Sequence, residues 1–463
     1  MLFVEFRFLL FFAVAFGVHW SLRGNALRKA WLLGCSLFFY AAWDWRFLGL
    51  ILVSTVVDYV AGLQIDRPEG RRKVWLGLSL CVNLGLLGVF KYYDFFVDSA
   101  GALIEFAGFQ AHLSTLELVL PVGISFYTFQ TLSYTLDVYA GRMRAHRNFL
   151  DVALFVAFFP QLVAGPIVRA RDFLPQMGSV RRLANVNVRA ALLLFLVGFV
   201  KKACVSDNLA TYVDAFYAAP EAYNTLGAWT ALLFYTVQIY CDFSGYSDMA
   251  IGAAALLGYR LCLNFHFPYL SGDISSFWRR WHISLSSWLR DYLFISLGGS
   301  RGKLARTIRN VLLTFALCGL WHGAAWHFVV WGMLHGVASC LRLLWKRAFP
   351  ESSRMGKATA AVGVPVTFLF VTCAWAFFRA DVDTAWVTLR TAFAFSVDGK
   401  DFGVLALALF GVLASAHVLA YLRVGRGLAR LPTWAFGLCY GCAFALALAF
   451  VPAEARPFIY FQF

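Results

Sequence analysis

Long uncharged apolar runs constrain this chain more than any other feature of its sequence. Four of them contain no Asp, Glu, Lys or Arg: Ala222–Cys241, Ala358–Phe378, Phe402–Leu422 and Leu431–Ala453. A helix that crosses a bilayer needs roughly 20 mainly apolar residues, so each run is long enough to span. Charged residues make up only 14% of the chain, whereas soluble globular domains carry about 25%. The sequence therefore predicts an integral membrane protein.

Weaker runs raise the expected number of membrane segments to about 10 to 13. They are Val74–Phe90, Val152–Val168, Phe8–Trp20, Trp31–Trp43, Phe47–Val57 and Ala190–Val200. Glu5 and Arg7 precede the first run and no small-residue cleavage pattern follows it, which favours a retained helix over a signal peptide. The run Val311–Leu341 is too long for one upright helix and contains several glycines, so it predicts two packed segments or one broken helix. Because the connections are too short to bury a core, we predict an all-α polytopic membrane protein with one domain over residues 1–463.

The net charge of +15 is concentrated in short loops such as Arg67–Lys73, Arg142–Arg147 and Arg301–Arg309. Short basic loops favour the cytoplasmic side of a membrane. A basic cytoplasmic face also attracts anionic lipid or a phosphate-bearing substrate. Nucleic acid is not an expected partner, because no soluble domain presents a basic groove.

Two apolar segments are interrupted by Pro, Gly and polar residues: Leu120–Gly141 and Phe158–Gln176. Irregular backbone at membrane depth requires cover by protein or a water-filled cavity, so both segments indicate either a re-entrant element at a cavity or a Pro-kinked helix. Asp242 and Asp248 follow a clean spanning run. Carboxylates are costly at membrane depth, so we expect both to face a polar interior.

The segment Ser276–Asn310 has apolar residues at nearly helical spacing, including Phe277, Trp281 and Trp288, with basic residues between them. This pattern predicts an amphipathic helix at the membrane interface. His282 lies within it, and from the sequence alone an interfacial ring bonded to a carbonyl is its simplest interpretation.

Three histidines, His322, His327 and His335, lie in the uncharged stretch Cys318–Gly336. His322 and His335 do not share a helix face, so metal-ligand spacing is absent and no metal site is expected. A neutral histidine desolvated among tryptophans can accept a proton near neutral pH, and glycines beside His322 allow other groups to approach it. General base and packed core histidine are both open at this point.

Several motifs together resemble the membrane-bound O-acyltransferase family, most closely its bacterial alginate O-acetyltransferase group. They are "FWRRWHISLSSWLRDYLF", "LWHGAAWHFVVWGMLHG", "PVGISFYTFQTLSYTLDVY", "FPQLVAGPIVR", "YCDFSGYSDMAIG" and the closing "PFIYFQF". The resemblance covers nearly the whole chain. It implies a helical bundle around a central tunnel, with the histidine of the WHG motif, here His322, as a catalytic residue. It also matches His282 to a second polar site residue, and it gives His327 no role.

The function implied by this resemblance is O-acetylation of a secreted exopolysaccharide, alginate-like or cellulose-like, by a multi-pass protein of the bacterial inner membrane. No bound cofactor is expected, and acetyl-CoA or a related acyl thioester is the expected donor. His322 would act as base, and His282 would orient a substrate or stabilise the oxyanion. The expected partners are the acetyl donor, a periplasmic acetyl-handling protein or the polysaccharide acceptor, and membrane lipid.

Further candidates rest on charge and position. Arg279, Arg280, Lys303 and Arg306 are candidates for holding donor phosphates, because guanidinium and ammonium groups suit such anions. Trp321, Asp242 and Asp248 are candidates for lining the tunnel. We expect His282 and His322 to face one continuous cavity, with their rings within roughly 10 Å of each other. A transporter or flippase for polysaccharide export is the alternative function, since many spans and broken helices also describe those proteins.

Overall fold

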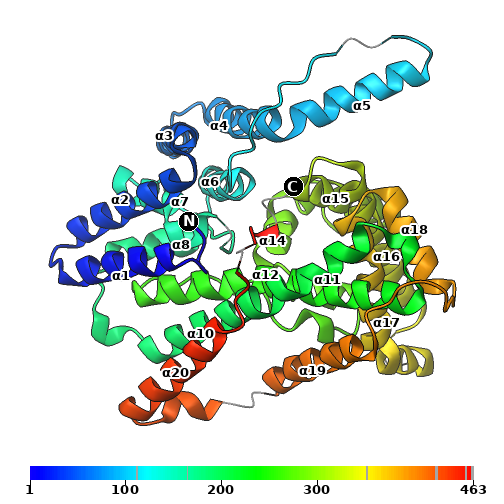
Figure 1. Cartoon of the computed structure of the whole chain (residues 1–463). Helices are drawn as coiled ribbons and strands as arrows, with labels where there is room; N and C mark the ends of the chain where they lie inside the picture. The colour runs from blue at the N-terminus through cyan, green and yellow to red at the C-terminus, as the bar shows by residue number, and fades with distance from the viewer. Residues whose placement is uncertain (111–112, 164, 351–352, 423–425, 454–455, 460–463) are drawn as a thin grey trace. The chain divides into compact units, whose positions relative to one another are not determined.

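The computed structural model describes residues 1–110, 113–163, 165–350, 353–422, 426–453 and 456–459. These residues are helical throughout, apart from loops and one isolated β-bridge between Tyr223 and Lys400 (Figure 1). The predicted all-α membrane protein is confirmed. The chain divides into two compact units, one of residues Met1–Ala191 with Ala250–Cys262, the other of Leu192–Met249 with Leu263–Phe463. The prediction of one membrane domain stays a prediction.

The first unit is built mainly from the helices that precede residue 174. They are α1 (Phe6–Ser21), α2 (Asn25–Asp44), α3 (Leu48–Ile65), α4 (Arg72–Leu87), α5 (Tyr93–Phe106), α6 (Ile124–Tyr139), α7 (Phe149–Ala157), α8 (Phe159–Leu162) and α9 (Ala170–Phe173). Short 3-10 and π turns join several of them: η1 (Trp45–Phe47), η2 (Gly88–Tyr92), η3 (Leu174–Gly178) and η4 (Leu183–Asn185).

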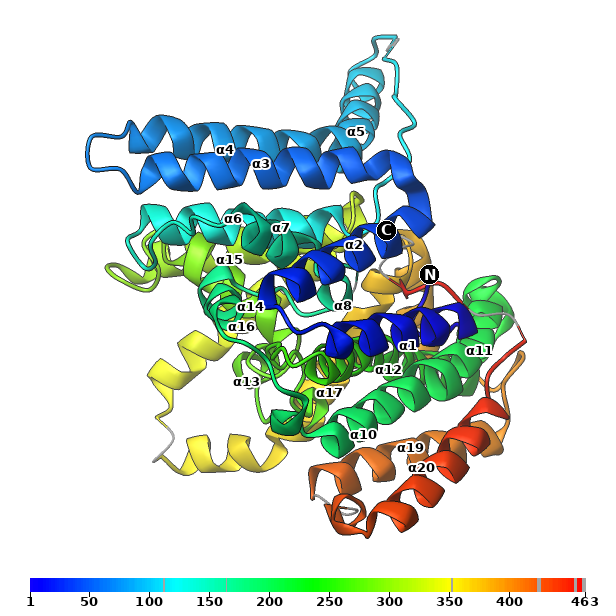
Figure 2. The same ribbon diagram turned by 90° about the vertical axis from the view of Figure 1, so that its left-hand side faces the viewer.

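Helices α3, α4 and α6 pack on one another, and α3 and α4 lie side by side in Figure 2. Polar side chains hold them together inside the unit. Asp58 of α3 accepts hydrogen bonds from Ser79 Oγ at 2.5 Å and from Asn83 Nδ2 at 3.0 Å, both on α4. Thr131 of α6 donates to Asn83 Oδ1 at 3.1 Å. Polar groups buried in this way are expected to be hydrogen-bonded, because burying a polar group without a hydrogen-bond partner costs folding free energy.

The second unit contains the remaining elements, and α10 and α12 contribute residues to both units. Its helices are α10 (Val188–Phe199), α11 (Asp207–Tyr217), α12 (Thr225–Leu256), α13 (Ile274–Trp278), α14 (Ile283–Trp288), α15 (Leu304–His322), α16 (Trp326–Ala348), α17 (Arg354–Arg379), α18 (Val382–Phe393), α19 (Val404–Tyr421) and α20 (Thr433–Leu448). The shorter turns are η5 (Val200–Ser206), η6 (Pro220–Ala222), η7 (Pro268–Leu270), η8 (Leu289–Phe294) and η9 (Arg426–Arg430).

Five helical stretches among the described residues are long and apolar enough to cross a membrane: Asn25–Ile65, Arg72–Phe106, Trp326–Ala348, Ala361–Arg379 and Val404–Tyr421. Two shorter apolar helices are Phe6–Ser21 and Thr433–Leu448. The predicted number of about 10 to 13 segments also counted shorter runs. The structure divides some of those runs among helices too short to cross alone.

Val152–Val168 is one such run, and the prediction of a single segment there is wrong. Helix α7 ends at Ala157, and α8 follows as a single turn over Phe159–Leu162 with Pro160 at its start. Proline lacks the amide hydrogen that a continuous helix would use, which explains the break. By contrast, α6 is uninterrupted, because Pro121 precedes it and Gly123 begins it in a left-handed conformation.

The predicted amphipathic helix over residues 276–294 is also wrong as a single helix. Helix α13 ends at Trp278, and α14 begins only after His282, which has φ 42° and ψ 53°. That left-handed backbone is sparsely populated by residues other than glycine and cannot continue a right-handed helix. Trp281 is fully buried beside this break, so the apolar stripe packs into the second unit.

The uncharged run Val311–Leu341 forms two packed helices, as one of its two interpretations predicted. Helix α15 ends at His322 and α16 begins at Trp326. The two helices approach closely where glycines carry no side chain. A Cβ atom at Gly319 would collide with the Phe328 carbonyl, and one at Gly332 would collide with the Phe315 carbonyl. Glycine is required at such close backbone approaches.

Candidate active site

His322 is the last residue of α15 and is buried in a ring of aromatic side chains. Its imidazole lies 5.0 Å from the Trp321 ring, 5.1 Å from Trp331 and 5.3 Å from Phe378, measured between ring centroids. Only 2% of the residue is exposed. The surroundings that the sequence predicted for this histidine, desolvated among tryptophans, are therefore confirmed.

His282 immediately precedes α14 and is held by Asn264. The Asn264 Oδ1 atom lies 3.2 Å from His282 Nδ1 and also accepts hydrogen bonds from the Ser284 backbone N–H and hydroxyl. Asn264 Nδ2 in turn donates to Ser247 Oγ at 3.2 Å. The left-handed backbone of His282 thus lies inside a network that fixes it, as strained residues at functional sites require.

These contacts select one tautomer of the His282 ring. A backbone N–H can only donate, so the Asn264 atom that receives the Ser284 N–H is the amide oxygen. His282 must then donate to that oxygen from Nδ1, which leaves the lone pair of a neutral ring on Nε2. Burial lowers the pKa of His282, which lies outside the five candidate spans, to about 3. The ring is therefore neutral at physiological pH, and its Nε2 lone pair can accept a hydrogen bond.

The two rings converge. The centroids of His282 and His322 lie 6.4 Å apart, and the planes are inclined by 59°. This agrees with the expected separation of roughly 10 Å or less. Trp321 lies edge-on to both histidines, at 5.9 Å from His282 and 5.0 Å from His322. Tertiary folding thus joins two histidines that lie on separate elements and share no helical period.

The two other histidines of the WHG-containing stretch have packing contacts. His327 Nδ1 lies 2.8 Å from the Phe377 carbonyl on α17. His335 is buried and accepts a hydrogen bond from Trp278 Nε1 at 3.3 Å. Among the described residues no group of three or more His, Cys, Asp or Glu side chains could hold a metal ion.

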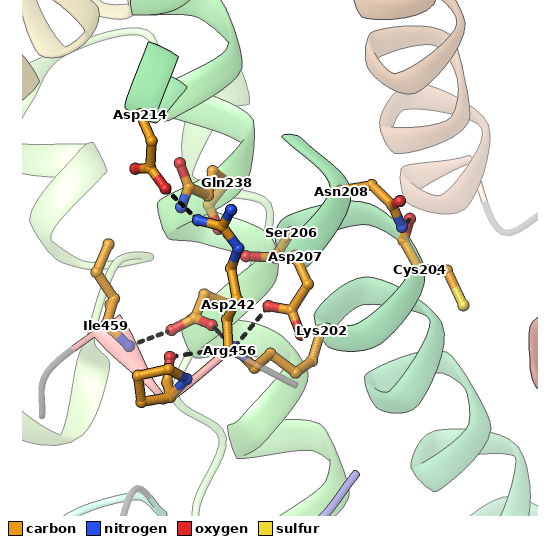
Figure 3. A network of polar contacts seen from close by, with 11 residues as sticks. Lys202, Cys204, Ser206, Asp207, Asn208, Asp214, Gln238, Asp242, Arg456 and Ile459 are labelled. Carbon is orange, nitrogen blue, oxygen red and sulfur yellow. Dashed lines mark hydrogen bonds and ion pairs between the residues drawn. The ribbon is translucent and has the colours of Figure 1, made fainter. Parts of the chain in front are cut away.

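The two aspartates proposed to line a tunnel form ion pairs with neighbouring lysines. Figure 3 shows Lys202 between Asp207 and Asp242, with Lys202 Nζ 2.8 Å and 2.5 Å from their carboxylates. Asp242 Oδ2 also accepts the backbone N–H of Ile459 at 2.9 Å. Asp248 pairs with Lys201 at 2.7 Å. The sequence suggested that Lys201 and Lys202 form a basic loop, whereas the structure places them in η5. Their pairing with the two aspartates was not predicted, because the lysines lie on another element and share no spacing with them.

The Lys202 cluster is connected to His282 through aromatic packing. Phe458, next to Ile459, lies 5.5 Å from the Phe243 ring. Phe243 packs edge-on against His282 at 4.6 Å between centroids. The segment that Asp242 anchors therefore contacts the wall of the histidine site. Residues 460–463 of the closing motif lie outside the described residues.

The basic candidates lie on the elements around the break before α14. Arg279 is exposed and donates to Ser276 Oγ, and Arg280 donates to the Leu270 carbonyl. Lys303 and Arg306 are exposed where α15 begins. No contact places these four side chains at the histidines, so their donor-binding role stays a prediction.

A mostly apolar cavity of about 340 Å³ is bordered by α13, α14, η8, α15 and α16. Trp278, Ser286, Arg290 and Cys318 are among the residues that line it. His282 and His322 are outside its walls, so the expected cavity continuous with both rings stays a prediction.

Comparison with known proteins decides the family. The profile of the MBOAT, membrane-bound O-acyltransferase family matches residues 142–380, which include both histidines. The chain belongs to the membrane-bound O-acyltransferase family. It is 43% identical to a probable alginate O-acetylase AlgI of Azotobacter vinelandii, over 85% of this chain and 78% of that protein.

Two further relatives agree with this assignment. A probable alginate O-acetylase AlgI of Pseudomonas aeruginosa is 42% identical over 89% of this chain and 78% of its own length. A peptidoglycan O-acetyltransferase of Helicobacter pylori is 39% identical over 76% of this chain and 71% of its own length. Membership of the membrane-bound O-acyltransferase family makes the protein a multi-pass membrane O-acyltransferase, as the sequence motifs predicted.

Asn264 is the site residue that sequence reasoning missed. It lies in an irregular segment after α12, where no periodicity or motif marks it.

We expect Asn264→Ala to lower acyl transfer by up to about a hundredfold, because without Asn264 the His282 ring is misplaced by the order of an ångström. Ser284→Ala, which removes one hydroxyl contact and leaves Asn264 in place, is expected to have a much smaller effect. Initial rates of both purified variants measure the difference, and equal rates would contradict the positioning role.

Proposed function

We propose that the protein moves acetyl groups from a cytoplasmic acyl thioester toward a secreted exopolysaccharide, from the bacterial inner membrane. The convergence of His282 and His322 at 6.4 Å inside one buried aromatic site is the observation that carries this proposal. The relatives whose names specify alginate or peptidoglycan O-acetylation support a polysaccharide acceptor. An alginate-like polymer is the favoured acceptor class.

In the proposed reaction His322 acts as general base. It takes the proton from an acceptor hydroxyl, either of the polymer or of a periplasmic relay protein, while the hydroxyl oxygen attacks the thioester carbonyl carbon. The tetrahedral intermediate then collapses, the C–S bond breaks, and the leaving thiolate takes up a proton. The product is the acetyl ester and a free thiol.

His282 is proposed to orient the acceptor. Its Nε2 lone pair can accept a hydrogen bond from a second hydroxyl of the acceptor, because Nδ1 donates to Asn264 and the one hydrogen of the attacking hydroxyl goes to His322. The alternative role as a hydrogen-bond donor to an oxyanion would require a second proton on the ring. Burial lowers the His282 pKa and opposes that proton, so the orienting role is favoured.

The test of this function separates enzyme from exporter. Cells that carry the His322→Ala variant at normal abundance are expected to secrete the polymer in normal quantity but without acetyl esters. Ester content and polymer yield are measured on the same culture supernatant. A polymer that is no longer secreted, rather than secreted without acetyl groups, would favour export as the function.

Arg279, which is exposed, and Arg280, which is half-buried, give a separate prediction about the donor. Arg279→Glu combined with Arg280→Glu is expected to raise the KM for a CoA thioester about tenfold or more, since a charge-assisted contact is worth about 1.5–3 kcal/mol. The kcat is expected to stay near the wild-type value. Arg390→Glu, on α18, is the control for charge reversal at a single exposed arginine. An unchanged KM in the folded double variant would remove these arginines from the donor site.

A further inference from the structure

A polar cavity of about 590 Å³ lies within the first unit, apart from the histidine site. The end of α3, the start of α4 and the chain that follows α6 enclose it. Its walls are formed by Ile65, Asp66, Arg67, Pro68, Arg72, Val138, Gly141, Arg142, Met143 and Arg144. Folding therefore brings together two of the basic loops, residues 67–73 and 142–147, which take no part in the proposed reaction.

The charge of this cavity is strongly unbalanced. Four arginines line it, and Asp66 is the one lining carboxylate among the described residues. Asp66 lies 3.3 Å from Arg144. Arg142 lies 3.1 Å from Asp137, which is buried behind the wall and is itself 3.8 Å from Arg171. These pairs leave a positive excess in the cavity, and like charges gathered in one cavity repel each other unless an anion is bound.

Two of the arginines are held by neutral groups. Arg67 donates to the side-chain oxygen of Gln64 at 3.0 Å. Arg72 donates to the Tyr139 carbonyl at 2.6 Å, and its guanidinium lies over the Tyr139 ring at 5.3 Å. A neutral acceptor or an aromatic face fixes a guanidinium without cancelling its charge. Both groups are thus oriented and retain their charge for a ligand.

We propose that this cavity is a binding site for a phosphate ester. The planar fork of arginine matches phosphate oxygens in pairs, and several arginines around one space suit a group with more than one negative oxygen. A volume of about 590 Å³ is in the range that holds a small ligand and accommodates a phosphorylated headgroup or a diphosphate. Positive-inside loops face the cytoplasm, where both anionic phospholipid and soluble phosphate esters are present.

The experiment uses the full chain purified in detergent and the double variant Arg67→Gln with Arg72→Gln. Arg390→Gln serves as the control, because it removes an exposed arginine from α18. The probes are phosphatidylglycerol, phosphatidylcholine, inorganic pyrophosphate and CoA. Native mass spectrometry measures retained lipid, and the thermal unfolding midpoint measures stabilisation by each probe.

The wild type and the control are expected to bind an anionic probe about tenfold or more tightly than the double variant. Preferential retention of phosphatidylglycerol over phosphatidylcholine identifies a lipid headgroup as the source. Stabilisation by pyrophosphate or CoA that is lost in the double variant identifies a soluble phosphate compound as the ligand of this cavity. The double variant Arg67→Lys with Arg72→Lys, which keeps the charge, is expected to bind the anionic probe with intermediate affinity. It distinguishes lost binding from misfolding of the glutamine variant. Equal affinity of the wild type and both arginine variants for every anionic probe would overturn the proposal.

Discussion

Replacement of His322 by alanine is expected to lower the rate of acetyl transfer about 10²–10⁴-fold, the contribution usual for a positioned general base. The reason is that the proton of the acceptor hydroxyl then has no base within reach of the thioester site. The loss should fall on kcat, because His322 is proposed to act in the transition state more than in binding. Single-turnover rates with a saturating thioester donor measure it.

His327→Ala is the matched control for this experiment. His327 lies five residues further on, at the start of α16, and contacts the Phe377 carbonyl rather than the second imidazole. We expect near-normal transfer from this variant. If the two alanine variants lose activity equally, the effect belongs to helix packing and not to proton transfer.

Replacement of Lys202 by methionine is expected to destabilise the fold by about 3–5 kcal/mol, because removal of one partner leaves buried carboxylates without a counter-charge. The side chain of Lys202 is 1% exposed, and those of Asp207 and Asp242 are 4% and 3% exposed. Methionine keeps most of the apolar volume of the lysine side chain, so the destabilisation would not come from lost apolar packing. The unfolding midpoint in denaturant, followed by tryptophan fluorescence, measures the change.

The adjacent lysine supplies the comparison. Lys201 pairs with Asp248, but their side chains are 24% and 13% exposed. The Lys201–Asp248 pair is partly accessible to solvent, which screens charges, so Lys201→Met should change stability less than Lys202→Met. A similar loss in both variants would show that burial of the Lys202 cluster is not the cause.

The sequence predicted the parts of the site that local patterns control. The uncharged run with its glycines predicted α15 and α16 as packed segments, because close helix approach needs glycine and spanning helices need apolar residues. It also predicted that His322 would be desolvated among tryptophans. The proximity of His282 followed from the requirement that a chemical site have convergent groups, rather than from any spacing.

Other features depend on tertiary structure and have no local signal. The apolar spacing of Phe277, Trp281 and Trp288 fits one continuous helix, and nothing in it indicates the left-handed backbone of His282. Asn264 contacts His282 across 18 residues from an irregular segment. Lys202 and Asp242 are 40 residues apart on separate elements. Such pairings are chosen by the packing of elements on one another, which periodicity along one element does not contain.

The hydrogen bond between Asp242 and the backbone of Ile459 also determines the order in which parts of the histidine site can form during synthesis. The two residues are 217 positions apart. At a synthesis rate of about 5–20 residues per second, the ribosome needs on the order of 10–40 s to pass from one to the other. During that interval Asp242 is already made, while the amide that binds it is not. The wall of the histidine site near Phe243 therefore cannot take its final form during insertion of α12. A nascent chain arrested before residue 458 should contain both histidines yet lack the packing that Phe458 gives to this wall.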